Sequence, residues 1–111
     1  GADVIIAHVG CTVGGSIGAV DATVSLDEAA AQTQAIIDAG KSVRDDIIYL
    51  SHGGPILTPS DAAFINERTD AVGFVGASSL ERMAVEQSLI NLTQEFKSIP
   101  VKRMANISIT R

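Results

Sequence analysis

The chain of 111 residues contains two histidines, His8 and His52, and each stands at the end of a short apolar run. Residues 4–9 and 47–51 are rich in β-branched side chains, which is typical of strands covered on both faces. The carboxyl ends of parallel strands meet at one edge of a sheet, so we expect both imidazoles to face one pocket. They could act there as general acid and base or as metal ligands. The alternative is that each histidine only hydrogen-bonds a neighbouring loop.

Glycines and serines follow the apolar runs, in three turns that should converge at the same edge. Glycine lets backbone amides approach an anion closely, and the start of a helix adds unpaired amides and a positive dipole end. Arg82 could neutralise an anion if its side chain points inward. The same residue types are also the ordinary ones for leaving a strand and capping a helix. The candidate anion- or substrate-binding residues are Gly14, Gly15, Ser16, Gly53, Gly54, Gly76, Ser78, Ser79 and Arg82.

Two other kinds of chemistry need further residues. A metal would require a carboxylate beside the histidines, and Asp21 and Glu81 would serve only if their loops fold inward, so the metal ligands stay unknown. Cys11 could be a nucleophile if a nearby cation lowers its pKa, or it could be a small buried thiol. Residues 10–18 are glycine-rich but lack the lysine of a P-loop, and residues 73–76 lack the central serine of a nucleophile elbow.

Two helix starts are marked by their capping residues. Ser25 and Glu28 have the spacing of a capping box, and Thr58 precedes Pro59 at the first helical position, with Asp61 at the third. The first of these helices carries a stripe at three-and-four spacing that should pack on a sheet, formed by Leu26, Ala29, Ala30, Thr33, Ile36, Ile37 and Gly40.

A third strand is predicted at residues 71–76, followed by a third helix. Ser78 and Glu81 again stand at capping-box spacing. Pro100 should end this helix or lie just past its end. The side chains expected to face inward, toward the sheet, follow one another at steps of four, three and four residues and are Val85, Leu89, Leu92 and Phe96.

The alternation of strands and helices predicts an α/β fold with a parallel sheet and right-handed crossovers. Residues 1–100 should form about three strand–helix units of a partial TIM-barrel domain, and residues 101–111 a tail that could hold a short strand at 107–109. Three strands cannot close a barrel of eight. We expect more of the same chain, dimerisation or a partner domain to cover the open edges. The start at Gly1, without methionine or signal peptide, suggests a chain that begins partway through a longer protein.

Composition limits the partners and the compartment. The net charge of −5 argues against a protein that holds nucleic acid by neutralising phosphates. The single cysteine excludes an intrachain disulfide and fits a reducing, cytoplasmic location. The uncharged stretch at residues 4–20 is interrupted by His8, Thr12, Ser16 and several glycines, so it predicts no membrane span. Aromatic residues make up only 4% of the chain, and small branched side chains favour α/β layers over an aromatic-filled sandwich.

Three segments together resemble the phosphoenolpyruvate hydrolase-like family of TIM barrels, also described as predicted TIM-barrel signal transduction proteins. The segments are HVGCTVGGSIG at residues 8–18, SHGGPI at 51–56 and GFVGASSLER at 73–82. The resemblance extends from Gly1 to about Pro100 and implies the carboxyl-terminal portion of a (β/α)8 barrel. It also implies an enzyme that acts on a small phosphorylated or carboxylated metabolite by hydrolase or lyase chemistry. The alternative is a non-catalytic module for ligand sensing, signal transduction or assembly that uses the same anion site.

The resemblance also bears on cofactors and partners. Phosphoenolpyruvate-type enzymes usually depend on Mg²⁺ held by carboxylates from earlier strands, so Mg²⁺ is implied by the resemblance alone and the cofactor is otherwise unknown. A similar domain is found fused behind an ATP-binding-like domain in some bacterial, fungal and plant proteins. The expected partners are therefore a small anionic metabolite, the remainder of the barrel or such a fused domain, or further copies in a homo-oligomer.

Overall fold

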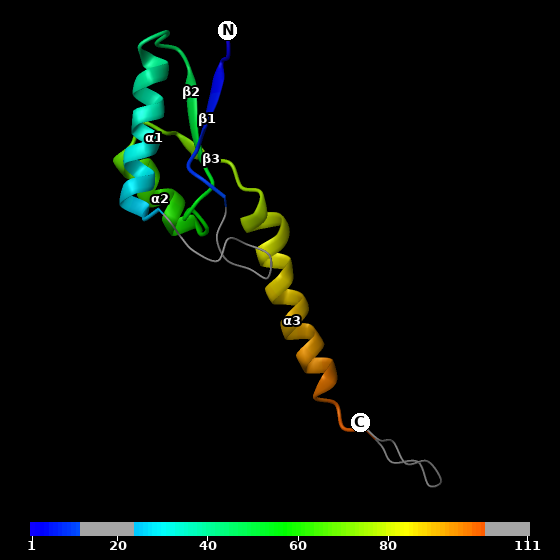
Figure 1. The fold of residues 1–111 in the computed structure, drawn as a ribbon. Helices are drawn as coiled ribbons and strands as arrows, with labels where there is room; N and C mark the ends of the chain where they lie inside the picture. The colour runs from blue at the N-terminus through cyan, green and yellow to red at the C-terminus, as the bar shows by residue number, and fades with distance from the viewer. Residues whose placement is uncertain (12–23, 102–111) are drawn as a thin grey trace.

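A computed structural model describes residues 1–11 and 24–101 and contains a three-stranded parallel sheet (Figure 1). The strands are β1 (Val4–His8), β2 (Ile48–His52) and β3 (Gly73–Phe74), and they lie side by side in chain order. The helix α1 (Leu26–Lys41) connects the first two strands, and α2 (Pro59–Arg68) connects the second to the third. The parallel α/β fold predicted from the sequence is confirmed.

The helix starts predicted at Ser25 and at Thr58 are both confirmed, and each is closed by a capping box. The Glu28 amide donates to the Ser25 hydroxyl at 3.2 Å, and the Ser25 amide donates to the Glu28 carboxylate at 2.8 Å. At the start of α2, Thr58 and Asp61 exchange the equivalent bonds at 3.2 and 2.8 Å. These bonds satisfy amides that have no partner inside the helix, so each helix begins where its local sequence specifies.

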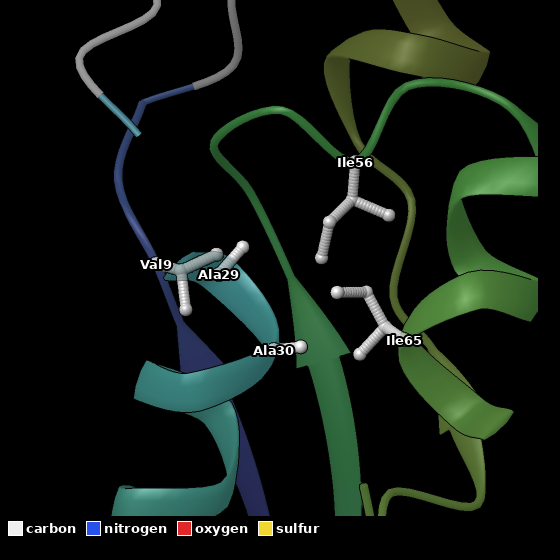
Figure 2. Packing of buried hydrophobic residues seen from close by; sticks show 5 residues of the cluster. All are labelled: Val9, Ala29, Ala30, Ile56 and Ile65. Atoms are coloured by element: carbon white, nitrogen blue, oxygen red, sulfur yellow. The ribbon is translucent and has the colours of Figure 1, made fainter. Parts of the chain in front are cut away.

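The two helices cover the same face of the sheet. Their shared core joins residues from β1, α1, α2 and the turn after β2, as Figure 2 shows for Val9, Ala29, Ala30, Ile56 and Ile65. A second cluster of buried residues, further toward the amino ends of the strands, consists of Ile37, Tyr49 and Ala71. The predicted inward stripe of α1 is confirmed, because its buried members are Ala29, Ala30, Thr33 and Ile37.

The opposite face of the sheet is apolar and largely uncovered by the described residues. Val4, Ile6 and Ile48 keep 45%, 48% and 51% of their surface exposed. The prediction of strands covered on both faces is therefore met on one face only. The continuous apolar run of β1 nevertheless supplies a face suited to burial, because successive side chains point to opposite sides of a strand.

The third strand is shorter than predicted. Its assigned residues are two instead of the expected six, although the backbone continues to pair with β2 on either side. The amide of Val72 donates to the Tyr49 carbonyl and that of Val75 to the Ser51 carbonyl, both at 2.9 Å. The Ser51 side chain, which is fully buried, also lies 3.3 Å from the Gly73 carbonyl oxygen. The strand predicted at residues 107–109 lies outside the described residues.

The third helical segment differs most from its prediction. It begins as a π-helical turn at Ser79–Met83 and continues as α3 (Ala84–Lys97), which runs away from the sheet (Figure 1). Ser78 already has helical backbone angles and its side chain makes no capping bond, so the predicted capping box is absent. The helix does not return to the sheet (Figure 1). The four side chains predicted to face inward are exposed instead: Val85, Leu89, Leu92 and Phe96.

Ion pairs gather at the amino ends of the strands. Arg44 pairs with Asp3 and Asp46, and Lys41 pairs with Asp70. The hydrogen bond from Lys41 holds the pKa of Asp70 below its usual value. Charge-paired residues therefore mark one end of the sheet, while the histidines mark the other. Within the described residues, no helix is both long and apolar enough to cross a membrane.

Candidate functional site

The two histidines are brought together at the carboxyl ends of β1 and β2. His8 and His52 are register partners in the parallel pair, and their ring centroids lie 5.0 Å apart with the rings at 67°. Alternation along the strands places His8 on the same face as Val4 and Ile6, which is the face that α1 and α2 leave uncovered. The imidazoles therefore lie at the carboxyl end of the open apolar face.

The ring nitrogens of the two histidines have opposite backbone partners. The amide of Gly10 donates to His8 Nδ1 at 3.2 Å. The Nδ1 atom of His52 lies 2.6 Å from the carbonyl oxygen of Val75. A carbonyl oxygen can only accept, so His52 carries its proton on Nδ1, whereas His8, which accepts there, carries its proton on Nε2 when neutral. When both rings are neutral, the Nε2 atoms therefore differ: that of His8 is a donor and that of His52 an acceptor.

The turns that follow β1 and β2 are joined by backbone hydrogen bonds. The amide of Val9 donates to the His52 carbonyl at 3.1 Å, and the amide of Gly54 donates to the Gly10 carbonyl at 2.8 Å. The parallel pairing thus continues beyond the strands. Because both turns are tied to each other, the two histidines are held at a fixed separation.

Three glycines at these turns have positive φ angles, which other residues rarely adopt. The angles are 115° at Gly10, 85° at Gly53 and 58° at Gly54. A Cβ atom on Gly53 would lie 2.4 Å from the Gly10 carbonyl oxygen, and one on Gly54 would lie 2.7 Å from the Val9 carbonyl oxygen. Close packing of the two turns therefore explains these glycines. The Gly54 amide also already donates within the protein, so it is not directed at a bound anion.

The third predicted turn lies after β3. Gly76 lies against the side chain of Leu80, and Ser78 and Ser79 enter the helix directly. Arg82 forms an ion pair with Glu86 at 3.2 Å, and the two side chains keep only 19% and 23% of their surface exposed. The charge of Arg82 is therefore balanced within the helix by a carboxylate one turn further on.

The remaining predicted residues are placed as follows. Gly14, Gly15 and Ser16 lie outside the described residues. Cys11 is an exposed free thiol and not the buried one weighed from the sequence. Within residues 1–11 and 24–101, no three His, Cys, Asp or Glu side chains lie close enough together to hold a metal ion.

Two backbone groups that bond to the histidines were not predicted from the sequence. The amide of Gly10 and the carbonyl of Val75 set the protonation pattern of the histidines. Neither group had a signal in the sequence, since almost every residue carries an amide and every residue a carbonyl. Only the turn after β1 brings the Gly10 amide to His8, and only the pairing of β2 with β3 brings the Val75 carbonyl to His52.

The sequence that forms this fold and these turns matches a defined family of proteins. The chain belongs to the phosphoenolpyruvate hydrolase-like family, which matches residues 1–99.

Among curated relatives, the chain is 50% identical over 103 residues to two proteins of Solanum lycopersicum, the "ToMV susceptible protein tm-1(GCR26)" and the "ToMV resistance protein Tm-1(GCR237)". These alignments cover 92% of this chain and 14% of each relative. The chain is also 30% identical over 99 residues to the "Putative transcriptional regulatory protein y4pA" of Sinorhizobium fredii, covering 89% of this chain and 16% of that protein. The chain therefore spans 14–16% of the length of the curated relatives it matches.

Proposed function

We propose that this chain forms part of a TIM-barrel enzyme domain that acts on a small phosphorylated or carboxylated metabolite by hydrolase or lyase chemistry. The observation that carries the proposal is the His8–His52 pair, whose Nδ1 atoms are held by groups of opposite hydrogen-bonding character. Two neighbouring imidazoles in opposite tautomers supply one proton donor and one proton acceptor to the same space, which is what acid–base catalysis requires.

The barrel assignment is supported by the winding of the sheet. The three strands are parallel and lie in chain order, and both connecting helices cover one face. This arrangement curves a sheet in one direction and leaves its other face for a barrel interior. The histidines then lie at the carboxyl end of the interior, where barrels place their active sites.

In this proposal the two histidines have distinct roles. For hydrolysis, His52 Nε2 takes a proton from the attacking water while His8 Nε2–H gives its proton to the departing oxygen. For C–C cleavage, His52 takes the proton of a substrate hydroxyl and His8 protonates the carbon that leaves with the electron pair. No step is assigned to a metal, since among the described residues no three His, Cys, Asp or Glu side chains come together.

The barrel can be tested separately from the chemistry. Ile6→Cys and Ile48→Cys place thiols on the open face, in a Cys11→Ser background. We expect these thiols to react rapidly with a water-soluble maleimide in the 111-residue chain and at least about 100-fold more slowly in a full-length protein that includes it, because buried thiols react only on opening. Equal reaction rates in both proteins would contradict a closed barrel. Val43→Cys, in the turn after α1 at a residue that is 83% exposed, is the matched control and should react equally fast in both proteins.

The enzymatic role is tested in the full-length protein with phosphoenolpyruvate and related oxo-acids. We expect His52→Gln and His8→Gln each to lower kcat/KM by roughly 10²–10⁴-fold, the usual contribution of a positioned acid or base. Lys41→Gln removes an ion pair at the opposite end of the sheet and should leave turnover unchanged. Wild-type turnover in a folded His52→Gln variant would refute the assigned role. Imidazole ¹⁵N shifts that showed the same tautomer in both histidines would also refute it.

A regulatory module is the second candidate, because one relative carries a name that describes transcriptional regulation. In that case the same site binds a ligand without converting it. Calorimetric titration of the chain with phosphate-bearing metabolites distinguishes the candidates: saturable binding without turnover by the full-length protein would favour sensing. A chain that binds nothing while the full-length protein turns substrate over would mean that other segments supply the binding residues.

A further inference from the structure

Helix α3 carries an apolar stripe that the described residues leave uncovered. None of its residues is buried, and the stripe keeps between 49% and 66% of its surface exposed. The stripe continues into the turn that follows the helix. Its members, Val85, Leu89, Leu92, Phe96 and Ile99, alternate at spacings of four and three residues.

This alternation is the repeat of a coiled coil. A spacing of four and three residues averages 3.5 residues, which keeps one seam facing a partner helix. A helix of 14 residues, about 21 Å long, is marginal in water without such a partner. The length therefore points to a covering partner, and the spacing suits another helix in that place.

The surface of α3 contains a groove that could receive a side chain of a facing helix. A shallow groove of about 250 Å³ is lined by Leu92, Glu95, Phe96 and Ile99. These residues stand at positions i, i+3, i+4 and i+7, the four that form the hole for one side chain of a facing helix. A partner with a small apolar side chain at the right height would fill this groove.

We propose that α3 pairs with α3 of a second copy of this chain, with the two helices antiparallel. In this alignment Val85 of each copy enters the groove beside Phe96 of the other, and Leu89 faces Leu92. The smallest side chain of the stripe therefore meets the largest, and the two leucines meet each other. Such size matching across facing positions fills space without gaps.

A parallel pair fits the same residues less well. It would place Phe96 against Phe96 at one level and Val85 against Val85 at another, which crowds one layer and leaves the other underfilled. It would also bring Glu81 near Glu86 of the other copy, whereas the antiparallel pair sets Glu86 beside Thr93 and Glu95 beside Ser88. Like charges across such a seam are destabilising. Size and charge therefore both favour the antiparallel orientation.

The first test is the concentration dependence of the mass of the 111-residue chain in analytical ultracentrifugation. We expect a monomer–dimer equilibrium that Leu89→Glu weakens by roughly 100-fold or more, because each dimer loses two buried leucine contacts. Gln94→Glu adds the same charge on the opposite side of α3 and should leave the equilibrium unchanged. A monomer at all concentrations, or an oligomer that Leu89→Glu does not weaken, would overturn the proposal. Far-ultraviolet circular dichroism confirms that both variants are folded.

The orientation is tested by disulfide formation in a Cys11→Ser background. An antiparallel pair should link a Leu89→Cys chain to a Leu92→Cys chain when the two are mixed, and each variant alone should link poorly. A parallel pair would link each variant to itself and would overturn the proposed alignment. Failure of both to link would show that some other segment or partner covers the stripe, and would overturn the pairing itself. None of these outcomes depends on catalysis.

Discussion

Helices α1 and α3 carry apolar stripes of similar spacing, but only that of α1 packs on the sheet. The two helices also differ in how they begin. The Ser25–Glu28 box fixes the turn into α1, and α1 returns over β1 and β2. At Ser78 the backbone is already helical and no side chain caps it, and α3 continues away from β3. An apolar stripe thus indicates that a helix has a face suited to burial, but its spacing alone does not identify the element that covers it.

The largest expected difference between the core and α3 is in the free energy of unfolding that is lost when an apolar side chain is removed. Ile65 is fully buried between α2 and the sheet, and Leu89 on α3 is 60% exposed. We expect Ile65→Ala to lower the free energy of unfolding by about 2–5 kcal/mol and Leu89→Ala by less than about 0.5 kcal/mol. Urea unfolding at low protein concentration, where the chain is monomeric, measures both. Equal losses would mean that α3 packs on its own sheet in solution.

The helix starts give the next largest difference. Thr58→Ala removes the hydroxyl that accepts the Asp61 amide, and should cost about 1 kcal/mol. Ser78→Ala removes a hydroxyl that makes no capping bond and should cost nothing measurable. Thermal unfolding of both variants under the same conditions provides the comparison. A clear loss of stability in Ser78→Ala would indicate that α3 is capped and turned back in solution.

The covered side of α1 contains a buried hydroxyl whose removal should stabilise the fold. The Thr33 hydroxyl is buried without a hydrogen-bond partner. We expect Thr33→Val to raise the free energy of unfolding by roughly 0.5–1 kcal/mol, because valine fills the same space without an unsatisfied group. Thr69→Val is the matched control and should destabilise, since the Thr69 hydroxyl donates to the Ile65 carbonyl and accepts the Ala71 amide. A destabilised Thr33→Val variant would show that the hydroxyl has a partner in solution.

The smallest expected effect is the change in stability with pH that the capping carboxylate at the start of α2 contributes. Burial raises the pKa of Asp61, but hydrogen bonds from the Thr58 and Leu57 amides and the Thr58 hydroxyl outweigh it and lower the pKa overall. A carboxylate with a lowered pKa in the folded state stabilises at neutral pH, and this stabilisation is lost as the pH falls through the lowered pKa. Asp61→Asn should therefore flatten the loss of stability on acidification. An unchanged slope between neutral and acidic pH would contradict the cap.

The sequence predicted the parts of the fold that depend on neighbouring residues. Ser25 with Glu28 and Thr58 with Asp61 are local signals, and both helix starts lie where these residues place them. The meeting of His8 and His52 followed from the parallel topology alone. The direction of α3 could not be predicted in this way, since Ser78 and Glu81 show the same spacing without forming the bonds.

The hydrogen-bonding pattern of the candidate site could not be predicted from the sequence either. The partner of His52 is the Val75 carbonyl, which only the β2–β3 pairing brings near. The glycines at 53 and 54 were predicted as anion ligands, but their positive φ angles and contacts with the preceding turn are sufficient to explain them. Glycine has several physical uses, and the residue type by itself does not distinguish among them.

The interlocked turns also limit how the site can evolve. A side chain at Gly53 would collide with the Gly10 carbonyl, and the Gly54 amide bonds to that same carbonyl. A single substitution in one turn is therefore deleterious unless the other turn has already moved, so changes at the two positions are epistatic. Substitution of the histidines removes their bonds to the Gly10 amide and the Val75 carbonyl but leaves the backbone bonds between the two turns in place, so it is the easier change. New chemistry at this site would then arise by replacing the side chains while the backbone around them is inherited unchanged.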